Sequence, residues 1–263
     1  MTELRHLQMV ILGIIKDVDK LCRNNNIEYY LLGGSAIGAI RHKGFIPWDD
    51  DLDIIMTNDN YTKFLEICKE QLDKDKYYLQ EGLIDWPLNY SKIKLRGTHI
   101  HEHEEYIDGV EDGIFIDVFK MDNVSGNLII GRWQYFCAKY YLSYTMSVRT
   151  YKSGSLKKRL MIASAFPLKC KSIRNFFVKQ TTMFNHKYTP LLGFFYGRTR
   201  WKSGVIPRKY FGKPTYVDFE DTKLPVAEHS HEYLTQVFGD YMKLPPKEQQ
   251  VGLHTIYIDF GNY

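Results

Sequence analysis

The run Asp49-Asp50-Asp51-Leu52-Asp53-Ile54-Ile55 places acidic side chains at the start of an apolar segment. Residues 52–56 have the composition of a buried β-strand, and alternate residues of a strand point to the same face. We therefore expect Asp51 and Asp53 to project together, with Leu52 and Ile54 in the core. Two carboxylates held that close repel each other unless a cation neutralises them. Oxygen ligands at this density favour Mg²⁺ or Mn²⁺ over zinc.

A third aspartate lies inside another apolar segment, Ile114-Phe115-Ile116-Asp117-Val118-Phe119. A lone carboxylate in a buried strand is costly unless it has a partner. A metal shared with Asp51 and Asp53 would explain it, and Asp117 would then be a metal ligand or a general base. Asp49 and Asp50 are weaker candidates. The alternative is that residues 49–51 form a solvated acidic turn and that Asp117 pairs with a buried Lys or Arg.

Upstream, Gly33-Gly34-Ser35 follows a short apolar run at residues 27–32. We expect a strand there that turns into a helix at residues 36–41, with Ser35 as the N-cap. Backbone N–H groups at such a turn bind anions, so the turn is a candidate site for a nucleotide phosphate. A strand, Gly-Gly-Ser, a helix, Asp-x-Asp and a third strand aspartate form the arrangement of the nucleotidyltransferase superfamily.

Basic residues near these motifs are candidates for binding the diphosphate of a nucleotide donor. Arg41, His42 and Lys43 lie between the two motifs, and Lys94 and Arg96 share one face of a predicted strand. The alternative for the first three is that they are exposed at a helix end, where positive charge interacts favourably with the helix dipole.

The wider patterns predict an α+β fold, in which helices flank a mixed β-sheet. Helices are expected at residues 3–23, 58–72 and 230–239, and strands at 77–80, 90–95 and 113–119. Residues 128–209 show mixed helical patterns, which indicate a largely helical insertion. Residues 207–225 are expected to form a loop-rich return.

Charge divides the chain into three segments. Residues 1–122 have a net charge of −9, residues 123–217 of +18 and residues 218–263 of −5. We therefore predict a catalytic core at 1–122, a basic, aromatic-rich helical segment at 123–217 and a C-terminal return at 218–263 that completes the core. The middle segment contains no Asp or Glu, which indicates an anionic partner.

Cysteine spacing and apolar segments indicate the cellular compartment in which we expect the protein. Cys22, Cys68, Cys137 and Cys170 lack metal-ligand or redox spacing, which is typical of thiols in a reducing compartment. The N-terminal residues do not resemble a signal peptide, and no apolar run is long enough to span a bilayer. We expect a cytoplasmic protein, peripheral at the inner face of the plasma membrane.

The basic segment combines cations with apolar residues, as in Lys157-Lys158-Arg159 next to Leu156, Leu160 and Phe166. An anionic membrane surface is one expected partner, because each cation near such a surface contributes about 1 kcal/mol. An anionic glycopolymer groove is another. Nucleic acid ranks last, because no recognised binding motif is present. A plain helical domain with solvated cations is the remaining alternative.

Longer motifs carry a family resemblance. Gly33-Gly34-Ser35 and residues 38–54, from Gly38-Ala39-Ile40-Arg41 to Asp51-Leu52-Asp53-Ile54, resemble the signature of the LicD family of phosphotransferases. Residues 113–119 resemble its second block. Its C-terminal block is resembled by Tyr233-Leu234, Phe238-Gly239-Asp240-Tyr241-Met242 and Leu244-Pro245-Pro246. No motif covers the basic segment.

The resemblance implies a nucleotidyltransferase-like fold and transfer of phosphocholine from CDP-choline. The acceptor would be a sugar of a bacterial surface glycopolymer, such as teichoic acid or lipopolysaccharide, either free or lipid-linked, and CMP would be released. It also implies that Asp51, Asp53 and Asp117 are metal ligands or catalytic carboxylates. Gly33, Gly34 and Ser35 would form the nucleotide-phosphate turn.

The sequence is compatible with three rival functions. Relatives of the family suggest transfer of a polyol phosphate from a CDP-polyol, and the superfamily suggests nucleotidyl transfer from a nucleoside triphosphate. A membrane-associated scaffold with an inactive nucleotide site is the non-enzymatic reading. Choline would require an aromatic cage, for which the candidates are Trp48, Trp86, Tyr90 and Trp133.

Overall fold

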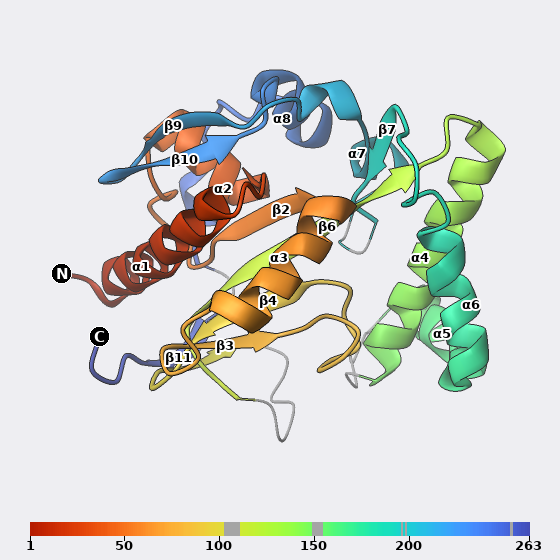
Figure 1. The fold of residues 1–263 in the computed structure, drawn as a ribbon, viewed down its shortest axis with the longest axis horizontal. Coiled ribbons are helices and arrows are strands. Elements are labelled where there is room, and N and C mark those ends of the chain that lie inside the picture. Colours follow the sequence, from red (N-terminus) through yellow and green to blue (C-terminus); the bar gives the residue numbers. More distant parts are fainter. Residues whose placement is uncertain (103–110, 149–154, 196, 198, 253–254) are drawn as a thin grey trace. The chain divides into compact units, whose positions relative to one another are not determined.

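The computed structural model describes residues 1–102, 111–148, 155–195, 197, 199–252 and 255–263 (Figure 1). The chain forms two compact units. The first contains residues 1–86, 90–120 and 210–263, and the second contains residues 87–89 and 121–209. The predicted α+β class is confirmed, because both helices and sheets are present. The segment boundaries predicted from charge stay a prediction.

The first unit is built on five strands in the order β1-β2-β6-β4-β3. They are β1 (Tyr30–Leu31), β2 (Asp53–Thr57), β3 (Tyr77–Gln80), β4 (Ser91–Leu95) and β6 (Phe115–Val124). Strands β3, β4 and β6 pair antiparallel, with Ile93 opposite Ile116 and Lys92 opposite Asp117. The strand expected at residues 27–32 is only two residues long, and β6 extends five residues beyond the predicted end.

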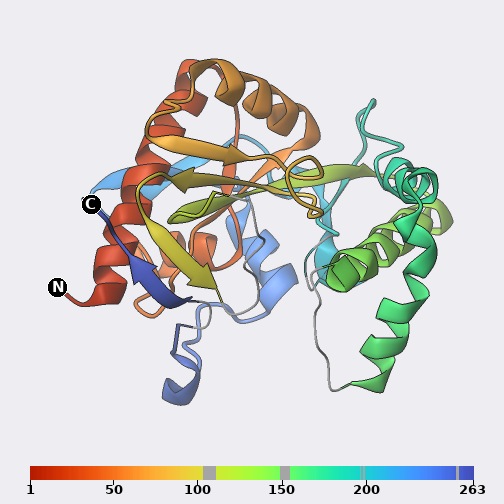
Figure 2. The ribbon, with the colours of Figure 1, turned by 90° about the horizontal axis from the view of Figure 1, so that it is seen from below.

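Two long helices cover one face of this sheet: α1 (Glu3–Asn24) and α3 (Asn58–Gln71) (Figures 1 and 2). Both were predicted from their apolar spacing. Tyr61 of α3 is hydrogen-bonded to Ser91 of β4 at 2.6 Å, and Tyr77 of β3 donates to Asp17 of α1 at 2.7 Å. Because side chains alternate along a strand, Lys92 and Asp117 must point to the opposite face.

The segment after β1 forms α2 (Gly33–Ile37), which continues as a π-helix, η1 (Gly38–His42). The expected N-cap role of Ser35 is wrong, because the helix starts three residues earlier, at Gly33, and its N-cap is Leu32. Gly33 has a φ of +56°, a left-handed conformation that glycine adopts without steric cost. This lets the helix begin directly after the strand, so Ser35 lies within it.

Residues 210–263 return to the first unit. They form β9 (Thr215–Phe219), β10 (Thr222–Val226), α8 (Ser230–Phe238), a short 3₁₀ helix η4 (Lys247–Gln249) and β11 (Thr255–Asp259), which pairs with β5 (His99–Glu102). The helix near 230–239 was predicted. The loop-rich return at 207–225 was wrong, because β9 and β10 form an antiparallel hairpin. The strand β10 was missed because Pro225 argues against a strand. Proline is nevertheless tolerated in a strand that has a single hydrogen-bonded partner.

The second unit is mainly helical. Its helices are α4 (Leu128–Val148), α5 (Leu156–Ser164), the 3₁₀ helix η2 (Phe166–Lys169), α6 (Lys171–Thr181) and α7 (Trp201–Gly204). Two short strands, β7 (Leu191–Gly193) and β8 (Val205–Pro207), pair with each other, and β7 pairs with residues 122–124 of β6. Its core is formed by Val124, Ala138, Phe195 and Val205. None of the helices among the described residues has the length and apolar character required to cross a bilayer.

Candidate active site

A cluster of four carboxylates lies at the start of β2, beside β6. Its members are Asp49, Asp51, Asp53 and Asp117. Asp53 is the first residue of β2, and the backbone N–H of Asp117 donates to the carbonyl oxygen of Leu52 at 3.1 Å. The pKa of Asp53 is raised well above its ordinary value, first by burial and then by the charges of Asp51, Asp117 and Asp49. Electrostatic interaction weakens with distance. The three predicted aspartates therefore lie near one another.

Asp49 belongs to the same cluster, although its sequence position made it a weaker candidate. Burial, the charges of Asp51 and Asp50, and a hydrogen bond with Asp51 raise its pKa to about 8. Asp50 is buried, with 7% of its surface exposed. Asp49 and Asp50 are therefore not part of a solvated acidic turn. The alternation argument for Asp51 needs correction, since β2 starts only at Asp53 and Asp51 precedes the strand.

Asp117 has a cationic neighbour. Lys92 lies opposite it on β4, and the Lys92 Nζ is 3.1 Å from the Asp117 Oδ1. Lys92 is 5% exposed, so the ammonium is almost fully removed from water. The expected alternative for Asp117, a buried ion pair, is therefore present within the carboxylate cluster. A buried ion pair of this kind depends on both partners, because either charge alone would be costly.

The chemistry of the cluster fits a hard divalent cation. Its donors are all carboxylate oxygens, and their mutual repulsion is what a dication would relieve. In the positions that the side chains take here, no three Asp, Glu, His or Cys residues of the described chain are arranged to hold a metal ion. The predicted Mg²⁺ or Mn²⁺ site at Asp51, Asp53 and Asp117 therefore stays a prediction.

The Gly-Gly-Ser segment lies against this cluster. The Ser35 hydroxyl accepts a hydrogen bond from the backbone N–H of Asp53 at 2.9 Å. A Cβ added to Gly34 would lie 2.9 Å from the Asp49 Oδ2, which is closer than real Cβ contacts. The backbone N–H of Gly33 donates to the Tyr233 hydroxyl at 3.4 Å. The segment thus positions the aspartates by direct contact, and its predicted role toward a nucleotide phosphate stays untested.

The basic residues at 41–43 occupy the end of the π-helix η1. The Arg41 guanidinium donates to the carbonyl oxygens of Tyr241, at 2.6 Å, and Lys243, at 3.4 Å. His42 accepts from Arg41 Nε at 2.9 Å, and its ring lies edge-on to Trp48 with 6.2 Å between centroids. Burial and then the Arg41 charge lower the pKa of His42.

Lys94 and Arg96 both contact Glu111. Lys94 Nζ donates to the Glu111 carbonyl oxygen at 2.8 Å, and Arg96 pairs with the Glu111 carboxylate. Strand β4 ends at Leu95, so the expected alternation along one strand does not extend to Arg96. The contacts of this pair anchor residue 111, just before β6.

Tyr233 and Phe119 lie within the family motifs, and Trp86 and Tyr90 are cage candidates, but the positions of these side chains in the site were not predicted from the sequence. Tyr233 on α8 is buried, and its pKa is raised, first by burial and also by the charge of Asp53, so its hydroxyl lies near that carboxylate. On the site face of the sheet, the rings of Tyr90 and Phe119 lie 4.5 Å apart, and Trp86 lies 4.7 Å from Tyr90. Phe119 shares a strand face with Asp117, a spacing of two residues that could have indicated it.

Two of these rings, together with that of Phe115, lie close to the Lys92 ammonium. The Lys92 Nζ lies 3.2 Å from the ring centroid of Phe115, 5.6 Å from that of Trp86 and 6.0 Å from that of Tyr90. Aromatic faces attract cations through their quadrupole. The Lys92 ammonium, beside the Asp117 carboxylate, is therefore a positive charge that already lies among aromatic rings. Of the proposed cage members, Trp86 and Tyr90 meet, whereas Trp48 lies beside His42 and Trp133 lies on α4 of the second unit.

Comparison with known proteins gives the family. The chain is 31% identical over 258 residues to the lipopolysaccharide cholinephosphotransferase LicD of Haemophilus influenzae. The aligned residues make up 95% of this chain and 96% of that relative. The chain belongs to the LicD family. Residues 26–145 match the family description "LicD/FKTN/FKRP, nucleotidyltransferase domain". The resemblance inferred from the motifs is thereby confirmed.

The LicD domain match includes most of the candidate site. Asp49, Asp51, Asp53 and Asp117, and the Gly-Gly-Ser segment, all fall within residues 26–145. Two shorter matches are to uncharacterized proteins. One, of Rickettsia typhi, is 43% identical over 57 residues, 22% of this chain and 18% of that protein. The other, of Rickettsia prowazekii, is 51% identical over 41 residues, 16% of this chain and 15% of that protein.

Proposed function

We propose that this LicD-family protein transfers phosphocholine from CDP-choline to a sugar hydroxyl of a bacterial surface glycopolymer, with release of CMP. Lipopolysaccharide or teichoic acid is the proposed acceptor. The observation that supports the proposal most is the carboxylate cluster of Asp49, Asp51, Asp53 and Asp117. It lies in a chain that aligns over nearly its full length with a lipopolysaccharide cholinephosphotransferase.

The proposed reaction is a displacement at phosphorus. The acceptor hydroxyl oxygen forms a bond to the phosphorus that carries choline, and the bond from that phosphorus to the bridging oxygen breaks. The electron pair of the broken bond remains on the phosphate of CMP. We assign Asp117 either to accept the hydroxyl proton or to complete a metal site. Lys92, 3.1 Å from Asp117, holds that carboxylate in place and offsets its charge.

Mg²⁺ or Mn²⁺ is the proposed cofactor, with Asp51, Asp53 and Asp117 as the residues that would hold it. A bound dication would supply neutralisation of the donor diphosphate and of the charge that develops on the leaving phosphate. Ser35 supports this arrangement, because its hydroxyl fixes the backbone at Asp53, at 2.9 Å. Gly34 allows Asp49 to approach, because a larger residue would collide with its carboxylate.

The aromatic group beside Asp117 is the proposed choline subsite. Tyr90 and Phe119 are both half-buried, and their rings form an aromatic pair on the strand face of Asp117, the carboxylate that we assign to the reacting phosphate. A quaternary ammonium binds ring faces. We therefore assign the headgroup to these two rings, with Trp86 packed behind Tyr90.

Product analysis tests the reaction. With CDP-choline, a glycan acceptor and Mg²⁺, we expect CMP and choline-bearing product in equal amounts. We expect Asp51→Asn to fold normally and to lose at least about a hundredfold in turnover, the loss seen when a single transition-state-stabilising group is removed. Release of pyrophosphate from a nucleoside triphosphate would identify nucleotidyl transfer instead. A folded protein whose melting temperature does not respond to Mn²⁺ or to any CDP ligand would favour the scaffold alternative.

The identity of the transferred group needs a separate comparison. If Tyr90 and Phe119 bind choline, Phe119→Leu should raise KM for CDP-choline and leave KM for CDP-glycerol and CDP-ribitol nearly unchanged. Phe136→Leu, on α4 of the second unit, is a control for loss of an exposed aromatic ring. Preference of the unaltered protein for a CDP-polyol would replace choline with a polyol phosphate as the cargo.

A further inference from the structure

The second unit carries positive charge that its own residues do not cancel. Its residues 121–209 contain 17 Lys and Arg and a single acidic residue, Asp122. Several of these cations instead lie over aromatic rings. They are Lys139 over Tyr135, Lys169 over Phe166, Arg174 over Tyr144, Lys187 over Phe184 and Arg208 over Tyr188, at 4.6–5.3 Å from the ring centroids. A ring face stabilises a cation without neutralising it, so the unit keeps a strong positive field.

A continuous row of aromatic rings runs along α4 and crosses to α6. Trp133 stacks on Phe136 at 5.7 Å, and Phe136 stacks on Tyr140 at 6.1 Å with an interplanar angle of 4°. Tyr140 meets Phe177 edge-on at 4.8 Å, and Phe177 meets Phe176 at 5.4 Å. We call Trp133, Phe136, Tyr140, Phe177 and Phe176 the aromatic row.

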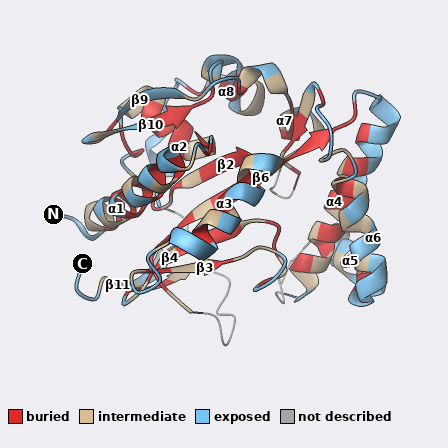
Figure 3. Ribbon diagram, viewed as in Figure 1, coloured by how far each residue is buried: buried red, intermediate tan, exposed pale blue. Residues whose placement is uncertain are grey.

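The aromatic row is exposed to an unusual degree. Phe136 is 51% exposed, Phe176 is 49% exposed and Trp133 is 40% exposed. Figure 3 shows much of α5 and α6 coloured as exposed. Leu160 of α5 and Phe166 of η2 add further apolar surface, at 62% and 70% exposed. Contiguous apolar surface of this kind marks an interaction site.

The residue types in the aromatic row indicate a lipid surface as the partner. Trp and Tyr favour the interface between water and lipid headgroups, because their rings are apolar and their polar groups can remain hydrated. The Trp133 indole N–H donates to Gln180 at 3.0 Å and the Tyr140 hydroxyl donates to the Ser164 carbonyl oxygen at 2.7 Å, so the polar tips of the row are satisfied within the unit. The rings can therefore enter a lipid interface without leaving the Trp133 N–H or the Tyr140 hydroxyl unsatisfied.

We propose that the second unit docks on an anionic phospholipid surface, with the aromatic row in the interface and cations of the same unit over the headgroups. Apolar burial and electrostatic attraction both contribute in this mode of binding. None of the described helices is suited to span the bilayer, so contact would be peripheral. A second copy of this chain is a poor partner for the same surface, because two units of equal positive charge repel. The proposal does not depend on the transfer chemistry proposed above.

Vesicle co-sedimentation of the full chain tests the proposal. We expect binding to phosphatidylcholine vesicles that contain phosphatidylglycerol, little binding to pure phosphatidylcholine vesicles, and loss of binding at high salt. The double variant Phe136→Ser/Phe176→Ser should weaken binding by roughly tenfold or more, because burial of one Phe side chain is worth more than a factor of ten. Ile84→Ser, which removes an even more exposed apolar residue of the first unit, should leave binding unchanged.

Trp133 provides a second readout that does not rely on mutating Phe residues. Brominated lipids should quench tryptophan fluorescence in the unaltered chain, and Trp133→Phe should remove most of that quenching. Several results would overturn the proposal. They are absence of vesicle binding at low salt, equal binding to neutral vesicles, or binding only to a nucleic-acid oligonucleotide. Because none of these measurements uses turnover, failure here leaves the proposed function standing, and an inactive enzyme leaves this result standing.

Discussion

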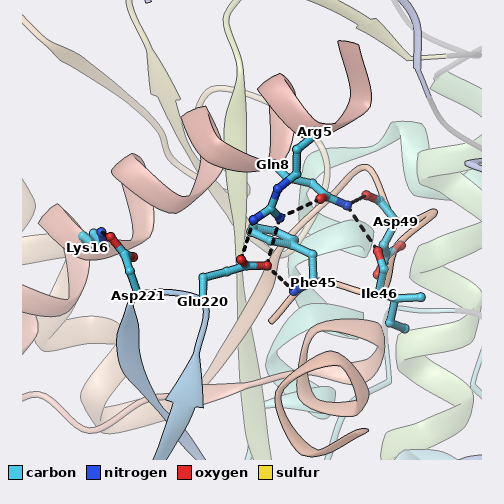
Figure 4. Close-up of polar contacts among 8 residues, drawn as sticks. All are labelled: Arg5, Gln8, Lys16, Phe45, Ile46, Asp49, Glu220 and Asp221. Carbon is cyan, nitrogen blue, oxygen red and sulfur yellow. Dashed lines mark hydrogen bonds and ion pairs between the residues drawn. The ribbon is translucent and has the colours of Figure 1, made fainter. Parts of the chain in front are cut away.

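The Gln8 side chain of α1 donates a hydrogen bond from Nε2 to the backbone carbonyl oxygen of Asp49, at 2.9 Å (Figure 4). The same amide also donates to the carbonyl oxygen of Ile46 at 3.2 Å, and Gln8 is only 3% exposed. A residue near the N-terminus thus fixes the loop that delivers Asp49 to the carboxylate cluster. This makes Gln8 a positioning residue for the site.

Gln8→Leu should lower turnover without unfolding the protein. The change removes this donor from one buried and one part-buried carbonyl oxygen, which costs about 1–3 kcal/mol of stability. It also frees the loop to move Asp49. Lys16→Met is a matched control, because Lys16 joins the same helix to Asp221 of the β9–β10 turn without contacting the loop (Figure 4). That exposed pair should be worth at most about 1 kcal/mol. Equal turnover in the two variants would argue against a positioning role.

Glu220 holds the other end of this loop, residues 43–49, near Phe45. This contact makes the stability of the fold dependent on acid pH. Its carboxylate accepts from the Arg5 guanidinium at 2.9 Å and from the backbone N–H of Phe45 at 3.1 Å. The hydrogen bond from Arg5 is the main cause that lowers the pKa of Glu220 below its ordinary value of 4.5. These contacts of Glu220 therefore stabilise the fold fully above pH 4.5, and this contribution is lost as the pH falls through the lowered pKa.

Comparison with Glu220→Gln measures that contribution. At neutral pH the variant should melt at a lower temperature than the unaltered chain, and the difference should shrink as the pH is lowered below 4.5. The pair is part-exposed, so the expected stability difference is about 1 kcal/mol. A difference that grows on acidification would contradict this role of Glu220.

Gly34 should not tolerate a methyl group. In Gly34→Ala the new Cβ would lie 2.9 Å from the Asp49 Oδ2, so the carboxylate must shift. Overpacking of this kind costs about 1–3 kcal/mol, and we expect a larger effect on turnover than on folding. Gly13→Ala on α1 has open space around its Cβ and should stabilise the helix by about 0.5–1 kcal/mol. Normal activity of Gly34→Ala would show that Asp49 is free to move.

The Lys92–Asp117 pair should behave as one unit. Lys92→Met leaves the Asp117 carboxylate without its buried cation, and breaking such a pair costs about 3–5 kcal/mol. The double variant Lys92→Met/Asp117→Asn should regain much of that stability, since no lone charge remains, yet stay inactive. Denaturant unfolding and turnover measured on all four proteins give the coupling. Additive losses of stability would show that the two side chains act independently.

Local sequence patterns determined much of this protein. The apolar spacing of α1 and α3 and the Asp-x-Asp and Asp117 motifs indicated the α+β fold and the aspartates, because helix and strand periods and buried charge are visible in a linear sequence. Long motifs of this kind also carried the family resemblance, which the full-length match confirmed.

Other features depended on residues that are distant in the chain. Ser35 read as a helix cap, but the fold brings its hydroxyl to the backbone of Asp53. Gln8 and Glu220 are ordinary polar residues in sequence, and only the packing of α1 and the β9–β10 hairpin around residues 43–49 brings both onto the loop before Asp51. Hydrogen bonds between such residues leave no periodic trace, so tertiary structure alone decides which side chains hold the carboxylates in place.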